Sequence, residues 1–202
     1  MSDPDDRLDR LSSGLFSPDT PLDQLAVDGY RPPGEVVWRP RPAAVLVALI
    51  RSPEPSLVLT VRSDFLASHA GQVAFPGGSR EGDEPFPVTT ALREANEETG
   101  IEPVSVRVLG LMRQFDTITA YRVVPVVGVL ETAPRFKPCP QEVRTVFTVP
   151  LDRALDPASY CRHQVRHRQR EYEVWSMRSE CWSVWGATAA VLAGLADLAA
   201  AG

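Results

Sequence analysis

The amino-acid sequence predicts an α/β (α+β) domain in which helices cover a central sheet. Runs of β-branched and apolar residues, which are typical of strands, stand both before and after one amphipathic helical segment. A second helical segment, rich in alanine and leucine, comes at the end of the chain. Strands on both sides of a helix, followed by a further helix, are typical of layered domains.

Length and composition exclude several classes of protein. The chain has 202 residues, which suits one domain of ordinary size. Apolar residues make up 44% and charged residues 23%, so a wholly disordered chain is excluded. The formal net charge of -5 argues against a broad electrostatic surface for nucleic acid. We therefore expect no nucleic-acid partner.

Residues 1–42 are predicted to form a proline-rich N-terminal extension, and residues 43–202 the main domain. Leu8, Leu11 and Leu15 have the spacing of one helical face, which indicates a short helix. The prolines at positions 18, 21, 32, 33, 40 and 42 then interrupt regular structure. The acidic first residues lack the apolar core of a signal peptide, so no export signal is expected.

The first elements of the main domain are strands, followed by a helix. Residues 43–50 form a continuous apolar run, as expected for a strand that is covered on both faces. Residues 56–62 follow after a short turn and predict a hairpin with the first strand. Residues 71–78 predict a brief strand that runs into a Gly-Gly turn. The next helix spans about 88–99 and stops at Gly100.

The second half of the domain is predicted to alternate strands with short helical segments. Strands are expected at 106–112, 121–130 and 142–149, with one helical turn at 150–155. Two weaker strand candidates, 160–165 and 171–177, flank a basic turn. The final apolar stretch, 186–202, is interrupted by Asp197 and is expected to dock by one face, since spanning a bilayer takes about 20 clean apolar residues. We therefore expect no membrane partner.

The cysteines indicate a reducing compartment. Cys139, Cys161 and Cys181 are far apart and odd in number, so they fit neither a disulfide framework nor a CxxC metal pair. The sequence thus predicts a cytoplasmic protein, with these three cysteines as core residues.

The helix at 88–99 carries more carboxylates than folding requires. Glu94, Glu97 and Glu98 share one arc, next to the apolar arc of Val88, Ala91, Leu92, Ala95 and Thr99. Like charges at i and i+4 destabilise a helix, and anions are disfavoured near its C-terminus. A solvated acidic face is one interpretation. The other is a site for a divalent cation, which prefers clustered oxygen ligands and to which Glu84 would add a fourth carboxylate.

This segment resembles the Nudix box of the Nudix hydrolases. The matching residues are Gly78, Glu84, Arg93, Glu94, Ala95, Glu97, Glu98, Gly100 and Ile101. The sequence departs from the pattern twice: eight residues instead of seven separate Glu84 from Arg93, and Ala95 is small for its position. The resemblance implies an α/β/α sandwich with a central mixed sheet, in which the box forms a loop–helix–loop, and Mg²⁺ or Mn²⁺ as the cofactor.

The segment before the box is similar to the signature of the coenzyme A pyrophosphatase branch of this family. Matches are found at Leu57, Leu59, Thr60, Arg62, Ser63, Gly71 and 75–78, and later blocks extend the resemblance to about residue 195. Ala67 departs from the signature, which has arginine there. The basic run between Arg162 and Arg170 is either a replacement for that arginine or a solvated turn.

The resemblance implies hydrolysis of coenzyme A or its thioesters to 4′-phosphopantetheine, or its acyl form, and adenosine 3′,5′-bisphosphate. The implied metal ligands are Glu94, Glu97 and Glu98, with Arg93 orienting a carboxylate. Glu142 is general base or extra ligand, and the choice of base between Glu142 and Glu94 stays open. The implied substrate-binding residues are Arg62, His69, Gly77 and Gly78, and a packing role is the alternative for His69.

Two other functions are left open. One is hydrolysis of another nucleoside diphosphate derivative, such as ADP-ribose, NADH or a nucleoside triphosphate. The other is a binding module without catalysis, against which the complete set of box glutamates argues. A homodimer is also left open as the oligomeric state.

Overall fold

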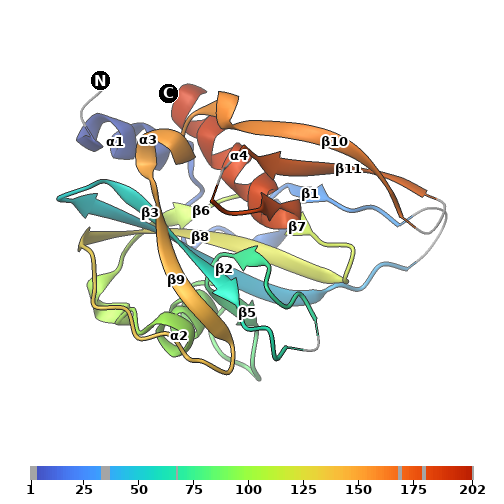
Figure 1. Ribbon diagram of the computed structural model, residues 1–202, viewed down its shortest axis with the longest axis horizontal. Helices are drawn as coiled ribbons and strands as arrows, with labels where there is room; N and C mark the ends of the chain where they lie inside the picture. The colour runs from blue at the N-terminus through green and yellow to red at the C-terminus, as the bar shows by residue number, and fades with distance from the viewer. Residues whose placement is uncertain (1–3, 33–36, 67, 168–169, 179–180, 202) are drawn as a thin grey trace.

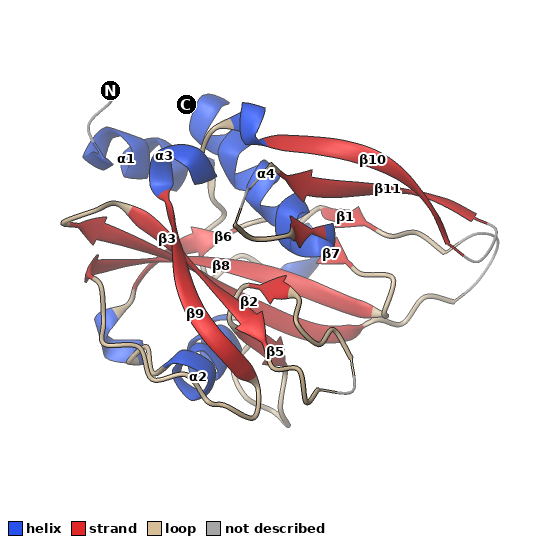
Figure 2. Ribbon diagram, viewed as in Figure 1, coloured by secondary structure: helices blue, strands red, loops and turns tan. Residues whose placement is uncertain are grey.

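The computed structural model describes residues 4–32, 37–66, 68–167, 170–178 and 181–201. Its centre is a nine-stranded mixed sheet with helices on both faces, so the predicted sandwich is confirmed (Figures 1 and 2). The helix α2 covers one face, and the helices α1, α3 and α4 lie on the other side (Figure 1). Ala67, where the sequence departs from its branch, lies outside the described residues.

Five strands of the central sheet follow predicted runs, whereas the strand expected at 71–78 is divided into β4 and β5, and β1 and β7 were not predicted. The strands of this sheet are β1 (Val27–Gly29), β2 (Arg41–Ser52), β3 (Ser56–Arg62), β4 (Val73–Ala74), β5 (Gly77–Ser79), β6 (Arg107–Leu111), β7 (Gln114–Asp116), β8 (Tyr121–Thr132) and β9 (Val143–Pro150). The main path is β1-β7-β8-β2-β3-β4, while β5 pairs with β2, β6 with β8 and β9 with β3. The pairs β2–β8 and β1–β7 are parallel and the others antiparallel, including the predicted β2–β3 hairpin.

The strand β2 is covered on both faces, as its continuous apolar run predicts. Leu46 and Ala48 belong to the core on the α2 side, whereas Val47 and Leu49 belong to the core that includes α1 and α4. All four side chains are fully buried. Because side chains alternate along a strand, odd-numbered residues of β2 face α4 and even-numbered ones face α2.

The helix α2 (Val88–Thr99) has the predicted bounds. Gly100 ends it in the left-handed conformation, with φ of 75°, and donates its N–H to the Asn96 carbonyl at 2.8 Å. Ala91 and Ala95 are fully buried against the sheet, while Val88 and Leu92 are only half-buried. The same packed helix therefore presents its glutamates at the edge of the sheet.

The opposite layer combines helices with a small second sheet. It contains α1 (Pro4–Gly14), α3 (Leu151–Ala154), α4 (Gly186–Ala201) and a three-stranded antiparallel sheet of β10 (Tyr160–His167), β11 (Arg170–Met177) and β12 (Val184–Trp185). Three short 3₁₀ helices complete the described elements: η1 (Leu22–Gln24), η2 (Pro103–Ser105) and η3 (Pro157–Ser159). The two weaker strand candidates are thus both strands, but they pair with each other outside the central sheet.

The N-terminal residues pack closely on the rest of the molecule. The predicted short helix is present as α1, which lies against α4 (Figure 1). Leu8, Leu11 and Leu25 are buried, and β1 extends the central sheet next to β7. The helices within the described residues are all too short or too polar to cross a membrane.

The expectation that the cysteines are core residues is wrong. Cys181 is exposed, while Cys139 and Cys161 are only half-buried, and all three are free thiols. Cys139 and Cys181 lie in loops, and Cys161 lies on β10, the edge strand of the small sheet, so packed layers do not cover them.

Candidate metal and substrate site

Three carboxylates meet at one edge of the central sheet. Glu94 and Glu98 extend from α2, and Glu142 comes from the loop before β9; each offers an oxygen within 4.8 Å of the others. We call these three residues the carboxylate cluster. Glu98 is buried, Glu94 is half-buried and Glu142 is exposed, so the cluster opens toward solvent on one side.

The expectation of a Gly-Gly turn is wrong, because Gly77 and Gly78 begin the short strand β5, which pairs with β2 and makes room for this cluster. Gly77 donates its N–H to Glu98 Oε2 at 3.0 Å, which fixes the buried carboxylate. A Cβ atom on Gly78 would lie 2.5 Å from the Glu94 carboxylate, and one on Gly77 would lie 2.4 Å from the Ala44 carbonyl oxygen. The backbone also has φ of +155° at Gly77, which side chains rarely permit. Gly78 is therefore required by the close approach of α2, and Gly77 by the close approach of β2.

The cluster is electrostatically unfavourable without a cation. Burial raises the pKa of Glu98 to about 7; the Gly77 hydrogen bond and the Arg62 charge oppose this shift, and the charges of Glu94 and Glu142 add to it. Burial also raises the pKa of Glu94, against the opposing effect of Arg93. A divalent cation among three carboxylates would stabilise their charged forms. The all-oxygen donor set suits Mg²⁺ or Mn²⁺, so the residues fit the implied cofactor.

Arg93 connects Glu84 to the cluster. Its guanidinium donates to both oxygens of Glu84, at 3.1 and 3.2 Å, and its Nη2 lies 3.1 Å from Glu94 Oε1. The hydrogen bond from Arg93 lowers the pKa of Glu84 to about 2, although burial opposes this effect. The Thr90 hydroxyl also donates to Glu84, at 2.7 Å. Glu84 thus holds Arg93, and Arg93 in turn orients Glu94.

Glu97, which the sequence places among the metal ligands, is not brought into the cluster. Its Oε2 accepts a hydrogen bond from Arg93 Nη1 at 3.0 Å, and its side chain is 56% exposed. Glu94 and Glu98 are four residues apart and share one line along α2, whereas Glu97 is turned away from that line and toward Arg93. A metal-binding role for Glu97 stays a prediction.

The loop that carries Glu142 is held from two sides. On the α2 side, Lys137 donates its N–H to the Thr99 carbonyl at 2.8 Å, and Cys139 donates to the Glu98 carbonyl at 3.1 Å. These bonds satisfy carbonyls that the C-terminus of a helix leaves free. On the β3 side, Ser63 donates its N–H to the Glu142 carbonyl at 2.8 Å and its hydroxyl to the Pro140 carbonyl at 3.1 Å.

Ser63 is a residue whose role the sequence does not reveal. Its side chain is buried, and the two hydrogen bonds that it donates go to the loop that places Glu142, while its hydroxyl also accepts from the Phe65 N–H at 3.4 Å. The only signal in the sequence is its position directly after Arg62 in the branch signature. A serine in such a motif can contact substrate or backbone equally well, so its partners follow only from the fold.

The predicted substrate-binding residues lie in different surroundings. Arg62 is half-buried, with its Nη1 3.7 Å from Glu98 Oε1, and its buried Nε has no partner among the described residues. His69 is exposed, and its Nδ1 lies 2.8 Å from Gln72 Oε1, so it is not a packing residue of the core. Both line the same cavity as the carboxylate cluster.

The basic run between Arg162 and Arg170 is only partly described. Arg162 Nη1 lies 3.0 Å from Glu173 Oε2, and its guanidinium lies 4.4 Å from the centre of the Trp175 ring. Arg168 lies outside the described residues. Arg162 therefore already has a carboxylate partner on the neighbouring strand.

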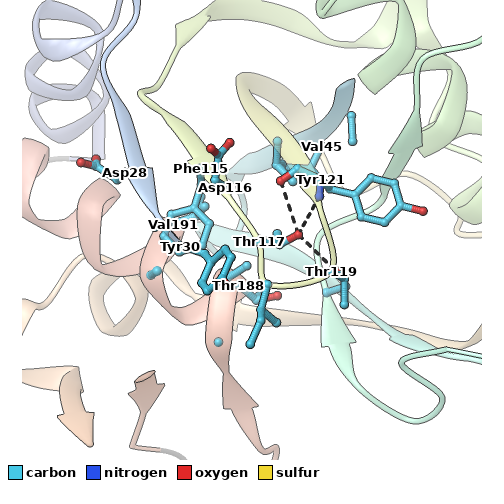
Figure 3. A pocket seen from close by; sticks show the side chains of 18 of the residues that line it. Asp28, Tyr30, Val45, Phe115, Asp116, Thr117, Thr119, Tyr121, Thr188 and Val191 are labelled. Carbon is cyan, nitrogen blue, oxygen red and sulfur yellow. Dashed lines mark hydrogen bonds between the residues drawn. The ribbon is translucent and has the colours of Figure 1, made fainter. Parts of the chain in front are cut away.

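A cavity of about 2380 Å³ extends from the carboxylate cluster along the face of the sheet that α4 covers. Val45 of β2 and Tyr121 of β8 line it from the sheet, and Thr188 and Val191 line it from α4 (Figure 3). Drug-sized ligands usually occupy about 300–1,000 Å³. The cavity is thus large enough for an elongated substrate that reaches well beyond the cluster.

A buried carboxylate anchors one wall of this cavity. Asp116 is fully buried and accepts two hydrogen bonds of 2.8 Å from Arg122 and one of 2.9 Å from Trp38 Nε1. Burial disfavours its charge, but the hydrogen bonds of Arg122 and Trp38 and the charges of Arg122 and Arg31 outweigh that effect and lower its pKa. Tyr30 donates its N–H to the Asp116 carbonyl at 2.8 Å. This network fixes the N-terminal residues that line the cavity.

Comparisons with known proteins agree with this arrangement. Residues 40–169 match the family model described as NUDIX domain. A protein named uncharacterized Nudix hydrolase NudL, from Escherichia coli (strain K12), is 41% identical over 156 residues, which cover 77% of this chain and 81% of the relative. A protein of the same name from Pectobacterium atrosepticum is 42% identical over 160 residues, covering 79% and 83%.

Solved structures of lower identity also match. The MutT protein from Methanosarcina mazei Go1 has a TM-score of 0.48 and 24% identity, covering 60% of this chain and 84% of that chain. The Nudix hydrolase RenU from M. smegmatis has a TM-score of 0.48 and 20% identity, covering 57% and 74%.

Proposed function

Because this chain belongs to the Nudix hydrolase family, we propose that it hydrolyses the diphosphate bond of coenzyme A or its thioesters. The products would be 4′-phosphopantetheine, or its acyl form, and adenosine 3′,5′-bisphosphate. The observation that carries the hydrolytic part is the carboxylate cluster beside Gly77 and Gly78 of β5. The choice of coenzyme A is supported by the similarity of residues 57–78 to the coenzyme A pyrophosphatase signature.

Glu94, Glu98 and Glu142 would hold Mg²⁺ or Mn²⁺, and Glu97 is proposed as a further ligand. When bound, such a cation neutralises diphosphate oxygens and lowers the pKa of a coordinated water. A protein whose formal net charge is -5 needs this reversal of local charge to hold a polyanionic substrate.

Residues around the cluster position the Glu94 carboxylate and the substrate. Arg93 keeps the Glu94 carboxylate in place through the 3.1 Å contact, with Glu84 as its support. Gly77 and Gly78 of β5 carry no side chain that would block a close approach by the diphosphate. Arg62, beside Glu98, provides a positive charge at the same edge, and the buried Nε without a partner is a donor for which a substrate oxygen is the natural acceptor.

We propose Glu142 as the proton acceptor. Glu94 shares its charge with Arg93, whereas no hydrogen bond to the Glu142 carboxylate is found within the described residues. A water molecule would attack one phosphorus of the diphosphate, the P–O bond to the bridging oxygen would break, and the water proton would pass to Glu142. The bridging oxygen leaves with the other phosphate.

The test is a comparison of substrates on the purified full chain. Coenzyme A, ADP-ribose, NADH and deoxynucleoside triphosphates are each incubated with Mg²⁺ or Mn²⁺, and the products are identified by mass spectrometry. We expect kcat/KM to be highest for coenzyme A or a thioester, with adenosine 3′,5′-bisphosphate as one product. A higher value for one of the other compounds would assign the enzyme to that substrate instead.

We also propose a cytoplasmic location. The three free thiols, of which Cys181 is exposed, suit a reducing compartment. Fractionation of cells that express the tagged full chain tests this proposal.

A further inference from the structure

Arg41 stands at the start of β2, on the strand face that is turned toward α4. Its guanidinium lies 4.1 Å from the centre of the Tyr121 ring, and the two residues are direct partners in the parallel β2–β8 pair. Both line the cavity that contains the carboxylate cluster. A planar guanidinium stacked on an aromatic ring is held in one orientation while its N–H groups stay available.

Arg41 differs from the other described arginines that line the cavity. Each of the others has a carboxylate within 4 Å: Arg31 faces Asp116 at 3.5 Å, Arg62 faces Glu98 at 3.7 Å, Arg113 faces Asp28 at 3.1 Å and Arg162 faces Glu173 at 3.0 Å. Among the described residues, no carboxylate pairs with Arg41. Its charge is thus the one left uncompensated among the described arginines of this cavity.

The strand β2 connects Arg41 to the carboxylate cluster. Val45 lies beside Gly77, whose N–H holds Glu98, and Arg41, Ala43 and Val45 alternate onto the same face of β2. Four residues of an antiparallel or parallel strand span about 13 Å. A second group of a substrate whose diphosphate lies at the cluster would meet Arg41 where the long arginine side chain shortens this span along the same face.

The charges around the cavity indicate that Arg41 favours substrates with a second anionic group. The described lining residues include the acids Asp28, Glu81, Asp116, Glu171 and Asp197 in addition to the cluster. Since each of the other described arginines of the cavity lies within 4 Å of a carboxylate, an anionic substituent would find an unshared positive charge at Arg41. An uncharged substituent would not need this residue.

We propose that the Arg41–Tyr121 pair is a binding site for a second anionic group of the substrate, a phosphate separated from the diphosphate that is cleaved. This inference rests on the proposed function, in which coenzyme A carries such a group as its 3′-phosphate. Arg41 would thus bind a substrate phosphate, the role for which the sequence analysis considered the basic run 162–170. ADP-ribose and NADH carry no phosphate beyond the diphosphate, so Arg41 would separate them from coenzyme A.

The experiment compares coenzyme A with dephospho-coenzyme A in the wild-type chain and in Arg41→Ala. We expect Arg41→Ala to raise KM for coenzyme A about tenfold or more, because it removes a charge-assisted contact, with kcat little changed. KM for dephospho-coenzyme A should change less than about twofold. Tyr121→Leu should act in the same direction but more weakly, since it removes only the platform under the guanidinium.

Arg107→Ala is the matched control, because Arg107 is an exposed arginine on β6 that does not line the cavity. It should leave both KM values unchanged. Equal effects of Arg41→Ala on the two substrates would overturn the inference while the proposed function stands. If the wild-type chain cleaves neither compound, the proposed function fails. Calorimetric binding of adenosine 3′,5′-bisphosphate and AMP then tests Arg41, and equal affinities in wild type and Arg41→Ala would overturn it.

Discussion

At the scale of single residues, Glu98 is the clearest case of a side chain that destabilises the fold but suits a metal site. Its carboxylate is almost completely buried, yet the nearest cation, Arg62, stays 3.7 Å away, and two further carboxylates lie close by. Burial of a charge costs several kcal/mol, and the Gly77 hydrogen bond and one arginine 3.7 Å away offset only part of that cost, so a protein that only had to fold would place an apolar residue here.

Neutral variants of the cluster test its role directly. We expect Glu94→Gln and Glu98→Gln each to lower kcat at least about 100-fold, because each removes a charged ligand of the metal. Both variants should stay folded, with a slightly raised melting temperature without metal, because carboxylate repulsion is relieved. Turnover and thermal unfolding measure these effects.

The control for this prediction is Glu102→Gln, an equal change of charge at an exposed residue just after α2. It should leave kcat unchanged. Near-wild-type turnover in both cluster variants would contradict the metal site. A loss in Glu97→Gln as large as that in Glu98→Gln would show that Glu97 leaves Arg93 to become a ligand.

Ser63 provides a test of how the loop at Glu142 is positioned. We expect Ser63→Ala to lower kcat and Mn²⁺ affinity about tenfold, with KM little changed, because the Pro140 carbonyl loses its donor and the loop loosens. Mn²⁺ affinity is measured by electron paramagnetic resonance without substrate. In a Glu142→Gln background, Ser63→Ala should cause little further loss.

Thr60→Val is the matched control for Ser63. Thr60 is also buried on β3 and donates its hydroxyl to a carbonyl, that of Ala74 at 3.1 Å, but it does not contact the loop. If Thr60→Val reduces kcat and Mn²⁺ affinity as much as Ser63→Ala, the effect reports general destabilisation and the positioning role is refuted.

At the scale of elements, Asp116 connects β7 to the N-terminal residues. Gly29 of β1 pairs with Asp116, and a Cβ atom on Gly29 would lie 2.4 Å from the Asp116 carbonyl oxygen. The side chain of the same residue binds Arg122 and Trp38. One buried residue therefore joins three segments by backbone and side-chain contacts together.

The lowered pKa of Asp116 predicts a pH-dependent contribution to stability. A carboxyl whose pKa is lower in the folded state stabilises the fold above its unfolded pKa, about 4, and this stabilisation is lost as the pH falls through the folded value. We expect Asp116→Asn to lower the free energy of unfolding by about 3 kcal/mol at pH 7. The difference from wild type should begin to shrink below about pH 4, where the unfolded side chain takes up a proton, and should vanish once the pH falls below the lowered pKa of the folded side chain.

Urea unfolding at several pH values measures this difference. Glu131→Gln is the control, because Glu131 forms an exposed ion pair with Arg51, 3.2 Å long, and such pairs contribute about 0–1 kcal/mol. A difference for Asp116→Asn that stays constant from pH 7 to pH 3 would show that its charge is not the source of the stabilisation.

At the scale of the whole molecule, the N-terminal residues belong to the folded unit. Leu11 of α1 is fully buried in the core that also contains Leu192 and Leu195 of α4. We propose that the N-terminal extension, of which residues 4–32 and 37–42 are described, acts as one of the layers that enclose the cavity. The family match begins at residue 40, so this layer comes from outside the matched region.

Leu11→Ala tests this packing. We expect it to lower the free energy of unfolding by about 3 kcal/mol, since it leaves a cavity between α1 and α4. Denaturant unfolding followed by circular dichroism measures the change. Ser13→Ala, at an exposed position of the same helix, should change stability by less than about 0.5 kcal/mol. A neutral Leu11→Ala would mean that α1 does not stay docked in solution.

Much of the fold could be predicted from local patterns. The bounds of β3 and α2 coincide with the predicted 56–62 and 88–99, because continuous apolar runs and a stop at Gly100 are encoded by neighbouring residues. The helix also carries the Nudix box, so the sequence alone identifies Glu94, Glu98 and Arg93. Glu142 is indicated by its resemblance to a later block, since nothing in the sequence places it near the helix.

Other features depend on long-range contacts that no local pattern encodes. By sequence Glu97 is equivalent to Glu98, but Arg93 competes for it in the folded protein. Ser63 and Pro140 are 77 positions apart, and Trp38 and Asp116 are 78 apart, so their hydrogen bonds exist only once β3, β7 and the loops are packed. The sequence by itself determined the family, the long strands, the helix and its carboxylates, but not the short strands β1 and β7. Only the tertiary structure decided which carboxylates meet and left Arg41 without a carboxylate partner among the described residues, because distances between distant segments follow from packing.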